Sequence, residues 1–225
     1  MDLTTAPNLF TSNLAESVFG ANPQYNAVQF HFHAGSEHTI DGKRHDFEMH
    51  TVHLAQEAKS GFEYAAVGII FSVNDYTARL TAAEQAIIDS FFESLDLESN
   101  EDPVVSMINY GHLLQMIDTN NRYVYKGSVT TPPCAQYVYW NVMTTIYPIS
   151  QKHLDLFKKQ LERGEAGKLA QYGNYRVTTP VDEHNVIRVA DNTFGNELKS
   201  SAQDATYNIN INIYNQGANK GSMCY

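Results

Sequence analysis

Three histidines in the first quarter of the chain have the types and the spacing of a metal site. His31 and His33 stand two residues apart, and His50 follows seventeen positions later. Side chains at positions i and i+2 of a strand point to the same face of a sheet, so His31 and His33 would lie together on an extended segment. A third imidazole from a neighbouring strand would complete a three-nitrogen set. Zinc held in this way keeps a fourth position for water or substrate, which is typical of catalytic sites.

The residues around the histidines predict the two strands that would bring them together. Residues 29–33 alternate polar and aromatic side chains, and residues 47–53 alternate again. Between them, Asp41-Gly42 is a dipeptide typical of hairpin turns. We therefore expect two antiparallel strands, joined across residues 34–46, that place His50 beside the other two histidines.

Two polar residues are in phase with the histidines on these strands. Gln29 shares a face with His31 and His33, and Glu48 shares a face with His50. Amide and carboxylate oxygens in such positions accept the spare ring N–H groups of metal-ligating histidines. An isolated His-x-His pair is more often an ordinary polar pair, but the third histidine and the two acceptors favour a metal site. The other histidines are interpreted as hydrogen-bonded or surface residues, the first of them buried: His38, His45, His53, His112, His153 and His184.

Three separate blocks of the sequence resemble the α-class carbonic anhydrases. The first is Gln29–His53, the second is Gly127–Cys134 followed by Trp140, and the third is Tyr172–Arg176. Their order and spacing agree with the family from about residue 25 to residue 190. The resemblance implies a zinc lyase that interconverts carbon dioxide and bicarbonate. It also implies a mainly β (α+β) fold, in which peripheral helices surround a twisted, mostly antiparallel sheet of the family's ten-stranded type.

The resemblance also implies a role for each residue of the site. The zinc ligands would be His31, His33 and His50. Thr130 would accept a hydrogen bond from the zinc-bound hydroxide and donate one to Glu37. The residues around the ligands would be Gln29, Glu48, Asn174 and His38. The apolar carbon dioxide pocket would be lined by Val52, Ala66, Val129, Val138 and Trp140, with Thr131 on the polar side of the cavity.

Length and composition are those of a single globular domain. A chain of 225 residues is large enough for a substantial core, and 43% hydrophobic with 12% aromatic residues exclude wholesale disorder. The net charge of −10 argues against nucleic acids and anionic membrane surfaces as partners. No apolar run is long enough to cross a bilayer, and residues 1–5 show neither the basic start nor the apolar stretch of a signal peptide.

The two cysteines are expected to be free thiols. Cys134 and Cys224 are far apart in the sequence, and a disulfide between them is the alternative interpretation. The family resemblance pairs a cysteine at the position of Cys134 with one near the N-terminus, where this chain has none. Free thiols favour a reducing compartment, the cytoplasm or an organelle.

Local patterns predict two helices and two further strands. Thr81-Ala-Ala-Glu84 is a capping box that opens a helix ending near Leu95, and Ser150 caps a second helix. Apolar, β-branched and aromatic runs predict strands over residues 64–73 and 137–147.

The chain divides at about residue 190 into a domain and a polar tail. Residues 1–190 are expected to form the carbonic-anhydrase-like domain, and no linker interrupts them. In the tail, residues 191–225, isoleucine alternates with asparagine over residues 207–215. This pattern indicates either a strand that extends a sheet edge or a disordered Asn-rich segment.

The segment before the histidines is shorter than the resemblance implies. Thirty residues precede His31, and none of them is a histidine. In the family this part supplies early strands and a proton-shuttling histidine, so we expect missing N-terminal strands, an exposed edge and slow proton transfer. A protein partner or self-association would cover that edge. Two functions stay open: zinc-dependent carbon dioxide hydration, slowed by the missing shuttle, and a structural or binding subunit of a larger assembly with weak or no activity.

Overall fold

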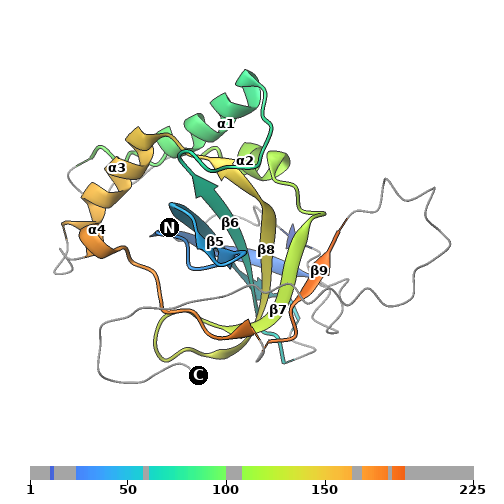
Figure 1. The fold of residues 1–225 in the computed structure, drawn as a ribbon. Helices are drawn as coiled ribbons and strands as arrows, with labels where there is room; N and C mark the ends of the chain where they lie inside the picture. Colours follow the sequence, from blue (N-terminus) through green and yellow to red (C-terminus); the bar gives the residue numbers. More distant parts are fainter. Residues whose placement is uncertain are drawn as a thin grey trace.

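A seven-stranded mixed sheet runs through the centre of the protein (Figure 1). The computed structural model describes residues 11–12, 24–57, 61–99, 108–163, 169–181 and 184–190, and everything below concerns these residues. In spatial order the strands are β1 (Thr11–Ser12), β2 (Tyr25–Ala34), β5 (Phe47–Ala55), β6 (Tyr64–Ser72), β8 (Gln136–Pro148), β7 (Arg122–Ser128) and β9 (Ile187–Val189). Among these neighbours only β6 and β8 run parallel, which confirms the mostly antiparallel sheet.

The hairpin that was predicted to join the histidine strands is confirmed. β2 pairs with β5 in antiparallel fashion, and the register sets His31 directly opposite His50. The connection contains a small second hairpin, β3 (Thr39–Ile40) with β4 (Lys43–Arg44). Asp41 and Gly42 turn it with φ angles of 50° and 74°. Two consecutive positive φ angles are what a type I′ turn requires, and Asp-Gly tolerates them.

Four helices flank the sheet: α1 (Ala82–Glu93), α2 (Tyr110–Met116), α3 (Gln151–Leu161) and α4 (Leu169–Tyr172). Both predicted caps are confirmed. Thr81 and Glu84 form the reciprocal capping box of α1, and the Ser150 hydroxyl accepts the backbone N–H of His153 at the start of α3. No pattern had predicted the seven-residue helix α2, which has no side-chain cap.

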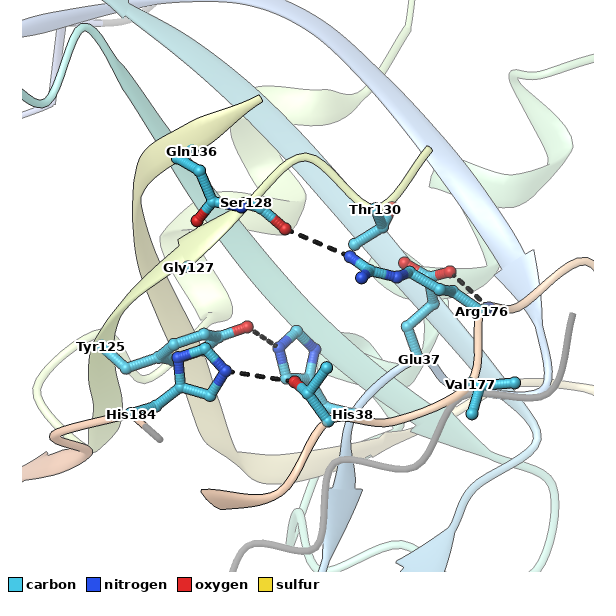
Figure 2. Close-up of a pocket in the computed structure, with 11 residues that line it drawn as sticks. Glu37, His38, Tyr125, Gly127, Ser128, Thr130, Gln136, Arg176, Val177 and His184 are labelled. Carbon is cyan, nitrogen blue, oxygen red and sulfur yellow. Dashed lines mark hydrogen bonds between the residues drawn. The ribbon is translucent and has the colours of Figure 1, made fainter. Parts of the chain in front are cut away.

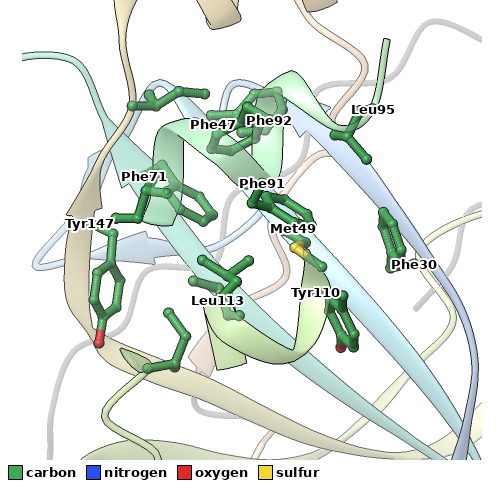
Figure 3. Close-up of a cluster of buried hydrophobic side chains, with 14 of the residues drawn as sticks. Phe30, Phe47, Met49, Phe71, Phe91, Phe92, Leu95, Tyr110, Leu113 and Tyr147 are labelled. Carbon is green, nitrogen blue, oxygen red and sulfur yellow. The ribbon is translucent and has the colours of Figure 1, made fainter. Parts of the chain in front are cut away.

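The main core fills the space between one face of the sheet and helices α1, α2 and α3 (Figure 3). Alternate residues of the strands supply one side of it, including Phe30, Phe47, Met49 and Phe71. The helices supply the other side through Ile88, Phe91, Phe92, Leu113 and Leu154. Because side chains alternate along a strand, Gln29, His31 and His33 of β2 point to the opposite face, as do Glu48 and His50 of β5.

The expectation of two free thiols is wrong for Cys134. This residue is buried in the turn before β8 and is disulfide-bonded. The expectation rested on distance along the sequence, but the entropy of closing a loop grows only slowly with its length. Spacing therefore does not limit which segments meet after folding, and the argument from free thiols to a reducing compartment no longer holds.

Some expectations lie outside the described residues. These include Cys224 and the alternating segment 207–215, so their conformations stay predictions. The sheet comprises seven strands in the described part of the chain, against the ten of the family type. Among the helices that the structure describes, none has the length and apolarity needed to cross a membrane.

Candidate metal centre

The three histidines singled out from the sequence meet on the face of the sheet opposite the helices. His31 and His33 come from β2, and His50 comes from β5. Their ring centroids are 5.0 Å (His31–His33), 5.2 Å (His31–His50) and 4.6 Å (His33–His50) apart. One nitrogen of each ring lies within 4.8 Å of the others. His33 and His50 are buried and His31 is half-buried, so the cluster opens on the His31 side.

Each imidazole has one nitrogen held by an acceptor. Nδ1 of His31 donates to Oε1 of Gln29 at 2.9 Å, and Nδ1 of His33 donates to the backbone carbonyl of Asn174 at 2.8 Å. Nε2 of His50 donates to Oε1 of Glu48 at 2.9 Å. These acceptors fix the tautomers, which leaves Nε2 of His31, Nε2 of His33 and Nδ1 of His50 with lone pairs. Nε2 of His33 is buried and has no hydrogen-bond partner among the described residues.

The environment keeps the three imidazoles uncharged at neutral pH. Burial, together with the neighbouring His50 and His33, lowers the pKa of His31 to about 3. Burial also lowers the pKa of His33 and of His50. Neutral imidazole is the form that binds a metal, so the cluster is ready to accept a cation without first losing protons.

A buried chain of hydrogen bonds supports His50 from behind. The carboxylate of Glu48 is fully buried and accepts from His50, from Nδ1 of His38 at 2.6 Å and from the backbone N–H of His38 at 2.8 Å. Nε2 of His38 lies 2.8 Å from the hydroxyl of Tyr125. Burial raises the pKa of Tyr125 well above its usual value, so the hydroxyl keeps its proton and donates it to His38. Burial acts to raise the pKa of Glu48, but His38 and His50 hold it well below its usual value.

Glu37 and Thr130 lie together beside the histidines. Oε1 of Glu37 accepts the backbone N–H of Arg176 at 2.8 Å, and Oε2 lies 3.8 Å from Nδ1 of His50. Burial raises the pKa of Glu37, whereas His50 and a hydrogen bond from Thr130 act to lower it. The carboxyl group is therefore linked to both the histidine cluster and the turn that carries Thr130.

An apolar wall continues the same face of the sheet. Val52, Ala66 and Trp140 lie opposite one another across β5, β6 and β8, so their side chains share one side. Ala66 and Trp140 belong to a buried cluster with Val138, and Val129 packs against it. The Trp140 ring lies 4.7 Å from the ring of His50. Thr131 is exposed on the turn after Thr130, apart from this wall.

A small cavity of about 50 Å³ has Glu37 and Thr130 in its lining (Figure 2). It is lined by polar and aromatic side chains, among them His38, Tyr125, Arg176 and His184. The guanidinium of Arg176 crosses it and donates to Oγ of Ser128 at 3.1 Å. The cavity does not include the three histidines; Glu37, His38 and Thr130 are the predicted site residues that line it.

The site offers three uncharged imidazole nitrogens with lone pairs, and a hydrogen bond holds the other nitrogen of each ring. Such a set suits a divalent transition metal. Imidazole favours zinc, copper, iron and nickel, and a three-nitrogen set without a charged ligand is typical of catalytic zinc. The buried, unpartnered Nε2 of His33 fits this interpretation, because buried polar atoms otherwise find partners. Fold and site together define a β protein with a cluster of three histidines on one sheet face that could hold a metal ion.

Comparisons with known proteins place this chain in a family. Residues 4–190 match the eukaryotic-type carbonic anhydrase family, and the chain belongs to it. It is 29% identical over 181 residues to putative carbonic anhydrase 3 of Caenorhabditis elegans, covering 77% of this chain and 68% of that protein. It is 31% identical to a carbonic anhydrase of Nostoc sp., covering 74% of this chain and 55% of that protein. Against Arabidopsis thaliana relatives the match spans less than half of their length, from 32% of alpha carbonic anhydrase 8 to 47% of alpha carbonic anhydrase 4.

Solved structures show the same fold. The α-carbonic anhydrase of Thermovibrio ammonificans, in complex with the inhibitor sulfanilamide, matches with a TM-score of 0.54 and 27% identity over 75% of this chain and 64% of that one. A carbonic anhydrase of Dunaliella salina matches with a TM-score of 0.54 and 27% identity over 76% and 63%. Dioscorin in complex with ascorbate matches with a TM-score of 0.56 and 26% identity over 78% and 65%. The α-carbonic-anhydrase fold that the sequence suggested is confirmed.

Sequence reasoning missed two polar residues of the site and understated the burial of others. Tyr125 was not identified, although its place on an alternating strand beside Gly127 could have indicated it. Arg176 stood in a recognised block but was given no role. His45, His53 and His153 are buried together with His38, so burial did not distinguish His38 from the rest.

Proposed function

We propose that this protein binds zinc through His31, His33 and His50 and catalyses the reversible hydration of carbon dioxide to bicarbonate. One observation carries the proposal: three nitrogens with lone pairs converge, while an acceptor holds the other nitrogen of each ring. Zinc bound there would act as a Lewis acid that lowers the pKa of its bound water towards neutral pH. Carbonic anhydrases are the standard example of this chemistry.

Thr130 and Glu37 would orient the reacting water. Thr130 gives its hydroxyl hydrogen to Glu37, so its oxygen can only accept a hydrogen bond from the water. Glu37 must be ionised for this, and the backbone N–H of Arg176 stabilises the carboxylate in its buried position. The water is then held with a lone pair directed away from Thr130.

The apolar wall would hold carbon dioxide against that lone pair. Carbon dioxide has no net dipole, so the half-buried Val52 and Val129 would offer it a surface on which water competes poorly, and the buried Ala66, Val138 and Trp140 complete the apolar wall. The wall would contribute to the rate by positioning the substrate, because carbon dioxide kept near the attacking oxygen reacts far more often than carbon dioxide in solution.

Stopped-flow measurement of carbon dioxide hydration by the zinc-loaded chain tests the proposal. We expect a rate well above that of His50→Ala, and inhibition by sulfanilamide, the inhibitor bound by the Thermovibrio ammonificans enzyme. A wild-type rate no higher than that of His50→Ala would refute the proposed activity.

We also propose that proton transfer to solvent limits the turnover. The described histidines outside the trio are either buried, as His38, His45, His53 and His153 are, or held elsewhere. His112 lies on α2, across the sheet, and His184 donates to the carbonyl of Lys126. Added imidazole buffer should then raise the turnover several-fold; a turnover independent of buffer concentration would contradict this step.

A second candidate function is a structural or binding subunit within an assembly. Dioscorin, a structural neighbour of this fold, was solved in complex with ascorbate. In the described part of the chain, the only strand on the outer edge of β2 is β1, which pairs with Tyr25 and Asn26, while the side chain of Asn174 bonds to Phe32 and Ala34. Light scattering during gel filtration would show assembly; a monomer with hydration activity would reject this alternative.

A further inference from the structure

The three contacts that orient the histidines differ in origin. Gln29 and Glu48 each lie two residues before the histidine they orient, on the same strand, so local geometry sets them. Asn174 is separated from His33 by 141 positions. The orientation of His33 therefore depends on how the segment 173–176 is fastened to the end of β2.

The side chain of Asn174 hydrogen-bonds to the backbone of β2 at the positions where a residue of a neighbouring strand would bond. Its side-chain Oδ1 accepts the backbone N–H of Ala34 at 2.7 Å, and its Nδ2 donates to the carbonyl of Phe32 at 3.0 Å. Its own carbonyl takes the Nδ1 hydrogen of His33. Three hydrogen bonds thus join Asn174 to β2, and of these only the bond from His33 to the Asn174 carbonyl involves the histidine cluster.

Tyr175 packs directly on the backbone on either side of this junction. Gly35 and Gly173 have φ angles of 69° and 85°, and a Cβ on either would lie 2.5 Å from the Tyr175 ring. A Cβ on Gly173 would also lie 2.3 Å from the carbonyl oxygen of Ala34. Both glycines are needed for this close approach, because only a residue without Cβ allows the ring to lie there.

Arg44 covers the same ring. Its Cζ lies 4.0 Å from the ring centroid of Tyr175, and its Nη1 donates to the carbonyl of Ser36. A guanidinium over an aromatic face at this distance is attracted by the π-electrons of the ring. Arg44 therefore joins β4 and the start of the β2–β3 connection to the segment that carries Asn174.

We propose that Arg44 and Tyr175 are positioning residues for His33. They clamp segment 173–176 against β2, keep the Asn174 carbonyl on Nδ1 of His33 and so fix the direction in which Nε2 of His33 points. The same segment presents the backbone N–H of Arg176 to Glu37, so the clamp also holds that carboxylate. The inference rests on the proposed zinc site but not on its catalytic activity.

Tyr175→Leu and Arg44→Gln remove the two halves of the clamp, and Tyr175→Phe retains the ring. Tyr172→Leu is the matched control for the first, because Tyr172 is an exposed tyrosine three residues earlier. Lys43→Gln is the control for the second, because it removes a neighbouring cation that pairs with Asp75 instead. Zinc affinity of each full-length variant is measured by competition with a chelator, beside its thermal midpoint.

Loss of an outer residue that orients a ligand commonly weakens metal binding 10–100-fold. We expect zinc to bind about tenfold more weakly to Tyr175→Leu and to Arg44→Gln, and normally to Tyr175→Phe and both controls. In the zinc-free chain, ¹⁵N NMR should show the Nδ1–H signal of His33 broadened or shifted in the same two variants, with those of His31 and His50 unchanged.

The outcomes separate this inference from the proposed function. Wild-type protein that binds no zinc would refute the zinc site, and the NMR signal of His33 would still test the clamp. Wild-type zinc affinity and an unchanged His33 signal in Arg44→Gln would overturn the clamp. If Tyr175→Leu does not fold, Arg44→Gln decides by the same two measurements.

Discussion

The two faces of β2 and β5 are built from the same strands but by different rules. On the helix side, Phe30, Phe47 and Met49 are buried among other apolar side chains, and aromatic rings meet at varied angles. On the other side, His50 and Glu48 are equally buried, but they hydrogen-bond to each other, and Glu48 also accepts two hydrogen bonds from His38. Close packing of apolar side chains stabilises one face, and specific hydrogen bonds stabilise the other.

This difference predicts how each face responds to change. A packed apolar face loses stability roughly in proportion to the volume removed, and it tolerates substitutions that conserve volume. A buried polar network loses more when one partner is deleted, because the remaining group stays buried without a hydrogen bond. Changes on the first face should alter stability, and changes on the second should alter metal binding.

The largest expected effect is the loss of the metal response in His50→Ala. Zinc that binds only the folded state, at a concentration a thousand times its dissociation constant, adds about 4 kcal/mol to the free energy of unfolding. Denaturant unfolding should show this increase for the wild type and none for His50→Ala. His153→Ala is the control, since it removes a buried histidine from α3 on the other side of the sheet. An undiminished zinc response in His50→Ala would exclude His50 as a ligand.

On the apolar face, Phe91→Ala should lower the free energy of unfolding by about 3–5 kcal/mol. Phe91 is fully buried and packs against Phe30, Phe92 and Tyr110. The zinc affinity of the folded variant should stay unchanged, because the site lies across the sheet. Phe91→Leu should recover most of the stability. A weakened zinc site in Phe91→Ala would show that the two faces are coupled.

Acid should destabilise the protein in part through His53. Its Nδ1 donates to the carbonyl of Thr51, and burial lowers its pKa to about 4 from an ordinary value near 6.5. The unfolded chain takes up this proton first, so the stabilisation is complete above pH 6.5 and is lost as the pH falls towards 4. The contribution is on the order of 3 kcal/mol.

Unfolding free energies measured between pH 7 and pH 4 test this assignment. The zinc-free wild type should lose stability in that range with a steeper slope than His53→Gln, by up to about 1.4 kcal/mol per pH unit. If the free energy of unfolding falls with the same slope in both proteins, His53 does not contribute to the loss of stability in acid.

The smallest expected effect lies outside both faces, at the start of α1. Thr81→Ala removes the side-chain acceptor for the backbone N–H of Glu84 and should destabilise the protein by about 1 kcal/mol. Thr81→Ser keeps the hydroxyl and should behave as the wild type in thermal unfolding. If Thr81→Ala leaves the stability of the protein unchanged, the packing of Phe91 and Phe92 is sufficient to stabilise this helix.

Local elements could be predicted from the sequence because their causes are local. The capping box at Thr81, the cap at Ser150 and the turn at Asp41-Gly42 depend on residues three positions apart or fewer. Helix α2 was missed because it has no side-chain cap and forms where tertiary contacts bury Tyr110 and Leu113. The disulfide of Cys134 was judged wrongly because distance along the chain says little about distance in space.

The sequence by itself determined which face of the sheet carries the three histidines. A period of two put Gln29, His31 and His33 on one side of a strand, and the short connection with its Asp-Gly turn indicated an antiparallel neighbour that carries His50. Only the tertiary structure decided how His33 is oriented, through Asn174, Tyr175 and Arg44, and how Tyr125 supports His38. The physical reason is that strand alternation fixes the direction of a side chain, whereas a hydrogen bond or ring contact across more than eighty residues exists only once the sheet has closed around it.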